Sequence, residues 1–167
     1  VLTVLENHFG DQIEATLIDL RGIKKDFVLY HIPDCDVYLH SVYTLDYNEQ
    51  LIIVKGLRKR IPQAKHIAGG PHVVTFQEES LKIFDTIIIG AGETSIIQAI
   101  KDLKSNKLKK KYYPNGREDI NSYPFSLRKY LPKATIARPG LLSLKHKKGY
   151  DKIIGTTVIF SRGCPYK

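Results

Sequence analysis

Methionine is absent from this 167-residue chain, and cysteine occurs only twice. Cys35 and Cys164 are too few for a disulfide framework, so the sequence predicts a reducing, cytoplasmic setting. No apolar run approaches the ~20 residues that a membrane-spanning helix needs. The first residues, VLTVLENHFG, also lack the basic flank of a secretory signal. We therefore expect no membrane segment, and the missing initiator methionine indicates either a natural start further upstream or processing.

Charge is distributed unevenly along the chain, whose net charge is +9. Residues 1–100 contain 9 Lys and Arg against 13 Asp and Glu, whereas residues 101–167 contain 17 against 4. Such a basic part is typical of a solvated linker beside a partner surface, or of a contact with nucleic acid or another polyanion. The sequence leaves both interpretations open.

Helix-like and strand-like segments alternate through the first hundred residues. Apolar spacing predicts helices over residues 2–9, 46–61, 77–83 and 93–103. Runs rich in Val, Ile and Tyr predict strands over residues 15–20, 36–43, 66–68 and 85–89. Such alternation is typical of an α/β fold, a doubly wound parallel sheet in a flavodoxin-like or Rossmann-like three-layer sandwich. Because such a domain normally opens with a strand and this chain opens with a helix, we expect the first strand to be missing.

The pattern divides the chain into three expected parts. Residues 1–104 form the α/β domain, and residues 105–155 form a basic linker in which periodicity stops. Residues 156–167 (TTVIFSRGCPYK) form a buried strand that runs into a loop carrying Cys164. The linker is expected to pack along a surface through aromatic anchors, namely Tyr112, Tyr113, Tyr123, Phe125 and Tyr130.

Three loops follow predicted strands and are candidates for binding. They cover residues 41–46 (SVYTLD), 69–72 (GGPH) and 90–94 (GAGET). In a doubly wound sheet, ligands lie outside the carboxyl ends of the strands. Glycines allow close backbone approach, and the helix that begins near Glu93 offers free amides to an anion. The same glycines also suit ordinary turns, and His72 suits either a ligand contact or a plain surface position.

Taken together, these motifs resemble a known domain. GGPHVV, EES and FDTIIIGAGET are similar to the cobalamin-binding domain that precedes many radical S-adenosylmethionine barrels, where the pattern is GGPHAT…PEE…D-x-x-x-x-GEGE-T. Ala91 stands where that family has Glu. The resemblance implies that the domain binds the nucleotide tail of cobalamin and that the corrin ring of the cofactor faces the barrel. The residues implied to contact the cofactor are Ser41, Thr44, Gly69, Gly70, Pro71, His72, Gly90, Gly92, Glu93 and Thr94.

The end of the chain carries a second resemblance. TTVIFSRGCPYK is similar to the strand and loop that open the radical S-adenosylmethionine barrel, whose cluster motif is C-x3-C-x2-C. Cys164 would then be the first cysteine ligand of a [4Fe–4S] cluster that, like S-adenosylmethionine, belongs only to the full-length protein. The match is strong at residues 66–95 and 156–167 and weak at 104–155. The D-x-H-x-x-G motif of some cobalamin proteins is absent.

The resemblance implies a function for a larger parent protein. That parent would be a radical-based methyl transferase or a related modification enzyme, acting on a small-molecule or macromolecular substrate that the sequence does not identify. This chain would be its inert cobalamin module, and its partner would be the missing barrel of the same chain. Two alternatives stay open. One is a flavodoxin-like binding or scaffold domain without cobalamin, and the other is an RNA-binding part that uses Lys107–Lys111.

Overall fold

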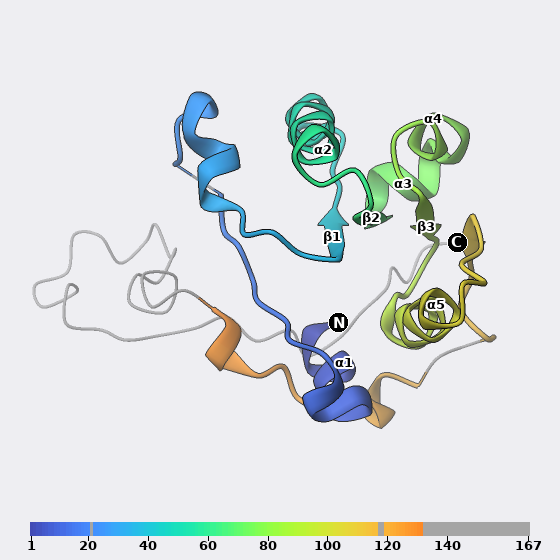
Figure 1. Ribbon diagram of the computed structural model, residues 1–167. Helices are drawn as coiled ribbons and strands as arrows, with labels where there is room; N and C mark the ends of the chain where they lie inside the picture. The colour runs from blue at the N-terminus through green and yellow to red at the C-terminus, as the bar shows by residue number, and fades with distance from the viewer. Residues whose placement is uncertain (21, 117–118, 132–167) are drawn as a thin grey trace, which may run out of the picture.

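The computed structural model describes residues 1–20, 22–116 and 119–131 (Figure 1). The expected strand at 156–160, the loop that carries Cys164 and most of the second half of the expected linker lie outside the described residues. The described residues include all of the expected α/β domain, residues 1–104, except residue 21.

Four parallel strands form one sheet in the order β1-β2-β3-β4. The strands are β1 (Val37–Ser41), β2 (Lys65–Gly69), β3 (Thr86–Ile88) and β4 (Lys111–Tyr112). The helices are α1 (Leu2–Phe9), α2 (Tyr47–Arg60), α3 (Pro71–Thr75), α4 (Gln77–Leu81) and α5 (Glu93–Lys104). Helices α2, α3 and α4 lie on one face of the sheet, and α1 and α5 lie on the other (Figure 1). The expected doubly wound α/β fold is confirmed.

The strands bury both of their faces, which explains their near-continuous apolar sequences. Ile67 and Ile88 pack with residues of α1 and α5, whereas their chain neighbours Ala68 and Ile87 pack toward α2 and α3. This alternation follows from the two-residue period of a strand. A third cluster, around Leu57, packs α2 against the segment that precedes β1.

Helix α5 has a well-defined end. Asn106 adopts φ 54°, a left-handed conformation. The Asn106 N–H donates to Leu103 O at 3.0 Å, and the Lys107 N–H donates to Asp102 O at 2.7 Å. These two bonds form a Schellman motif, which satisfies carbonyl groups that the helix itself leaves unpaired.

The strand predicted at residues 15–20 is wrong. The chain there lies outside the sheet, and Leu17 and Ile18 remain 41% and 38% exposed. The apolar pattern suits a strand, but a strand needs a neighbour that pairs with its backbone. In the described part of the chain β1 pairs only with β2, so this segment does not occupy the free side of β1 and pairs with no other strand.

The stretch assigned to the linker contributes to the domain. β4 begins at Lys111, and Tyr112 is a buried core residue. Farther on, the Leu127 N–H donates to Thr3 Oγ1 at 2.9 Å, and Tyr130 bonds to Glu6. Tyr112 and Tyr130 therefore act as the expected anchors.

Phe125 does not act as an anchor. Its side chain is 98% exposed, because the contacts that hold this segment to α1 come from residues on either side of it, including an ion pair of 2.5 Å between Lys129 and Glu6. Tyr113 is likewise exposed.

A close backbone contact joins the ends of β1 and β2. Gly70 has φ 109°, and a Cβ atom added there would lie 2.6 Å from Val42 O and 2.9 Å from Val42 N. The Val42 N–H donates to Gly69 O at 2.8 Å. Only glycine fits both this backbone conformation and this distance.

We predict that Gly70→Ala lowers the free energy of unfolding by about 3 kcal/mol or more, because strain at φ 109° adds to a clash with the Val42 backbone. Urea unfolding followed by circular dichroism measures the change. Gly10→Ala is the matched control. Gly10 also has positive φ, but nothing lies within 4 Å of its added Cβ, so about 1–2 kcal/mol is expected. Equal losses at the two glycines would contradict the role of the Val42 contact.

Candidate binding site at the carboxyl edge of the sheet

Three neighbouring strands end at one edge of the sheet, because all of them run in the same direction. Ser41, the last residue of β1, is in register with Gly69, the last residue of β2. β3 lies beside β2 and is followed by the glycine-containing loop at 90–94. The structure therefore gathers the three candidate loops along a single edge, with every predicted cofactor residue on one of them.

The first half of the edge is organised around His72. The His72 ring is 3% exposed, which corrects the interpretation of a surface histidine. It stacks on Tyr47 with ring centroids 4.0 Å apart and lies 4.8 Å from the Phe76 ring. Thr44 Oγ1 lies 3.2 Å from His72 Nδ1. The other ring nitrogen, Nε2, is buried and has no hydrogen-bond partner among the described residues.

The second half of the edge follows β3. Gly90 has φ 80°, and a Cβ added there would lie 3.4 Å from the Pro114 ring. Glu93 is buried at the start of α5, where its negative charge meets the positive end of the helix dipole. Thr94 is exposed beside it. Ser95, which the sequence did not single out, has a buried Oγ with no hydrogen-bond partner in the described part of the chain.

The edge also exposes large apolar side chains. Tyr43 is 55% exposed, and Leu45 is fully exposed on the same loop. Ser41 and Thr44 are exposed residues of the same loop, and the Thr44 hydroxyl contacts His72. An edge that offers apolar area, hydroxyls and glycine backbone suits a ligand with both apolar and polar parts.

Tyr47, Phe76 and Glu79 are residues that the sequence reasoning missed. Burial raises the pKa of Tyr47, and the charge and the hydrogen bond of Glu79 raise it further. No motif marks these residues, since Tyr47 and Glu79 look like ordinary helix positions and Phe76 lies between α3 and α4. Their contacts with His72 and with each other depend on how α2, α3 and α4 pack, which no local pattern shows.

Comparison with known proteins adds a single finding. No protein-family model matches the chain, and no curated protein matches it. The N-terminal domain of the hypothetical protein TM0182 from Thermotoga maritima has a similar structure, at 26% sequence identity and a TM-score of 0.47. The match covers 68% of this chain and 85% of that one. A likeness at this level shows neither a family nor an activity.

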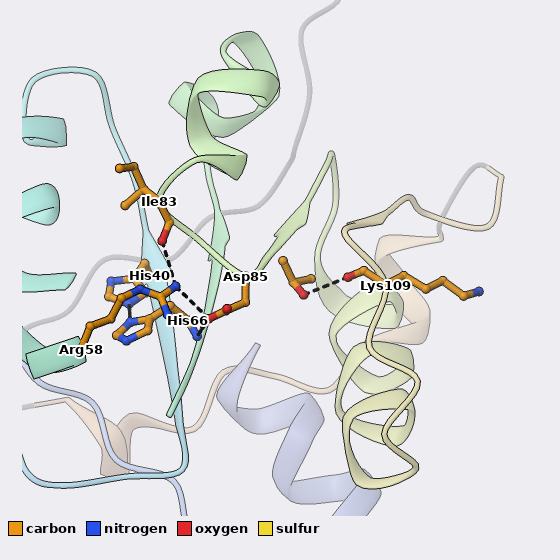
Figure 2. A network of polar contacts seen from close by, with 7 residues as sticks. His40, Arg58, His66, Ile83, Asp85 and Lys109 are labelled. Atoms are coloured by element: carbon orange, nitrogen blue, oxygen red, sulfur yellow. Dashed lines mark hydrogen bonds and ion pairs between the residues drawn. The ribbon is translucent and has the colours of Figure 1, made fainter. Parts of the chain in front are cut away.

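A partly buried polar network lies between α2 and the sheet (Figure 2). Gln50 Oε1 accepts a hydrogen bond from His40 Nδ1 at 3.0 Å, so His40 Nε2 carries a lone pair and accepts from His66 Nδ1 at 3.1 Å. Asp85 Oδ2 accepts from the His66 backbone N–H at 2.8 Å and from Arg58 at 3.0 Å. The network joins β1, β2, α2 and the start of β3, and His40 directly precedes the edge residue Ser41.

Burial keeps the two histidines of this network neutral. It lowers the pKa of His66 to about 4, and His40 and Arg58 act in the same direction. It also lowers the pKa of His40, while the hydrogen bond to Gln50 opposes the shift. At Asp85, burial acts to raise the pKa, but the His66 N–H and Arg58 outweigh burial and hold the pKa below its usual value.

The described residues hold neither a recognisable metal centre nor a membrane-spanning helix. Among the described residues, no group of three or more His, Cys, Asp and Glu side chains is arranged to hold a metal ion. None of the helices within the described ranges has the length and the apolar character to cross a bilayer. Cys164, the predicted cluster ligand, lies outside these ranges.

We predict that the free energy of unfolding decreases as the pH falls from 6.5 to about 4. In this window the unfolded chain takes up a proton at His66, whereas the folded chain holds His66 neutral. The stabilisation is thus complete above pH 6.5 and is lost as the pH falls through the folded pKa of about 4. The shift corresponds to about 3 kcal/mol. Urea unfolding at a series of pH values measures it.

Two variants check this assignment. His66→Phe keeps an aromatic ring in the sheet but removes one of the two buried histidines, so its stability should depend less on pH in this window, and His40 accounts for part of the dependence that remains. His8→Gln removes an exposed histidine and should leave the dependence unchanged. A His66→Phe chain that keeps the full pH dependence would show that other groups produce it.

Proposed function

We propose that this chain is the cobalamin-binding-type module of a radical S-adenosylmethionine enzyme and that it is inert alone. When bound, cobalamin would supply a transferable methyl group, and the barrel of the parent protein would supply the radical chemistry. The parent would be a radical-based methyl transferase or a related modification enzyme. The motifs at residues 69–74, 78–80 and 84–94 support this proposal through their resemblance to that domain.

The single structural observation that supports the proposal is the shared carboxyl edge of β1, β2 and β3. The three loops that carry the motifs lie far apart in the sequence, at residues 41–46, 69–72 and 90–94, yet they follow adjacent parallel strands. A ligand as broad as cobalamin needs contacts from several loops at once, and the crevice at strand ends is where such folds bind ligands.

The residues present fit the chemistry of such a cofactor. The hydroxyls of Ser41, Thr44 and Thr94 are on exposed residues and suit the polar groups of a nucleotide tail. Tyr43 and Leu45 offer exposed apolar area to a large ring system. Gly70 has a different role, because its backbone is already closed against Val42. We therefore assign Gly70 to shaping the loop rather than to touching the cofactor.

We predict that hydroxocobalamin titrated into the protein produces a saturable change in its visible spectrum. Ser41→Arg combined with Thr94→Arg should weaken binding at least tenfold, because two long cations would occupy the edge, an effect of about 1.4 kcal/mol or more. The matched control is Gln63→Arg, an exposed position in the turn that leads into β2 at the opposite edge of the sheet. This control should bind as the unmodified chain does.

Other results would overturn the proposal. No spectral change at hundreds of micromolar hydroxocobalamin would favour a scaffold domain that holds no cobalamin. Binding of flavin mononucleotide in its place, seen as quenched flavin fluorescence, would favour a flavodoxin-like binding domain. Equal weakening by Gln63→Arg and by the pair at the carboxyl edge would place the ligand elsewhere.

A further inference from the structure

The segment from the end of α5 to β4 presents a dense set of lysines. Between residues 101 and 111 there are six lysines and one acidic residue, Asp102. The Asp102 carboxylate already accepts hydrogen bonds from Tyr112 at 2.7 Å and from Gln98 at 2.6 Å. Lys111 is paired with Glu78 at 2.7 Å. Within the described ranges the other lysines of this segment form no ion pair.

The end of the helix does not account for these lysines. Cations near a helix C-terminus often compensate for its unpaired carbonyls. Here the Schellman motif at Asn106 and Lys107 already supplies backbone donors to Leu103 O and Asp102 O. Lys107, Lys109 and Lys110 also lie beyond the helix. All three are exposed, and Lys109 Nζ lies 6.0 Å from the centre of the Tyr112 ring.

The backbone under the lysines is held in place. Leu108 packs against the core cluster of α1 and α5. Thr86 Oγ1 donates to Lys109 O at 2.9 Å, and the Ile87 N–H donates to Lys110 O at 2.9 Å. Figure 2 shows the Lys109 side chain extended away from this contact. A fixed backbone presents cations to a partner without the entropic cost of ordering a loop.

An open groove of about 370 Å3 lies next to these lysines, between α1 and the end of α5. The residues that line it are His8, Phe9, Gln12, Lys101, Lys104 and Ser105. None of them is acidic, and five of the six carry a polar or cationic group. Lys104 Nζ donates to Gln12 Oε1 at 3.0 Å and lies 5.8 Å above the centre of the Phe9 ring.

We propose that this groove, together with Lys107, Lys109 and Lys110, binds the phosphodiester backbone of a single-stranded nucleic acid. Phosphate contacts need cations and polar donors, and both are present here. The one carboxylate of the segment, Asp102, is engaged by Tyr112 and Gln98. Protein interfaces are depleted in lysine and need exposed apolar anchors, whereas Phe9 is buried. The surface is thus less suited to an acidic protein.

This binding surface is separate from the cofactor edge. The segment 105–110 leads into the start of β4, so it lies at the amino edge of the sheet, opposite the loops that follow β1, β2 and β3. Nucleic-acid binding would be an additional function of the chain. An experiment can disprove it without disproving cobalamin binding, and the reverse also holds.

The test uses the whole chain and a fluorescein-labelled oligouridylate, with binding followed by fluorescence anisotropy across a range of salt concentrations. Replacement of Lys101, Lys104 and Lys107 by Gln should weaken binding about tenfold and reduce the slope of log affinity against log salt by about 2. A second variant, Gln12→Glu, places a carboxylate in the groove and should also weaken binding.

The matched control replaces Lys55, Lys59 and Lys82 by Gln. These exposed lysines lie on α2 and just after α4, on the other face of the sheet, and give the same change in net charge. The control should keep most of the affinity. Equal loss in both triple variants, or unchanged binding in the groove variants, would overturn the proposal. Unlabelled poly-glutamate and unlabelled oligouridylate are then compared as competitors of the labelled strand at equal total charge. If poly-glutamate competes equally well, the partner is an acidic protein and the proposal is wrong.

Discussion

The approach of Gly70 to the Val42 backbone is the constraint on which the carboxyl edge depends. It fixes the loop after β2 against the end of β1, so that the loops at 41–46 and 69–72 become one surface. The Thr44–His72 contact and the stacking of His72 on Tyr47 follow from it, because α3 begins directly after this glycine. Parallel pairing of β3 with β2 then brings the third loop to the same edge.

The sequence predicted the parts of the fold that depend on local pattern. The strands at β1, β2 and β3 and the helices α2 and α5 could be found from apolar spacing and glycine positions. The segment at 15–20 could not, because a strand also requires a pairing partner, which no local pattern reveals. Tyr112 was assigned to a linker for a related reason. β4 has only two residues, too few for a periodic signal.

The loops of the candidate site could be predicted from the sequence, whereas the buried contacts behind these loops could not. The motifs predicted that Ser41, Gly69 and Gly90 lie where three strands end. Because these strands are parallel neighbours, the three residues lie along one edge of the sheet. The burial of His72 between Tyr47 and Phe76, and the link from Gln50 through His40 to His66, depend on how α2 and α3 sit on the sheet. Such contacts arise from packing across elements, so reading along the chain does not find them.

One open side of the sheet has a practical consequence. In the described part of the chain β1 pairs with a neighbour on one side only, and Leu39 on this strand is partly exposed. Peptide groups on an unprotected strand edge form hydrogen bonds readily with the same edge of another molecule. We therefore expect this side of β1 to be where copies of the chain associate at high concentration, and a charged residue in place of Leu39 should weaken that association.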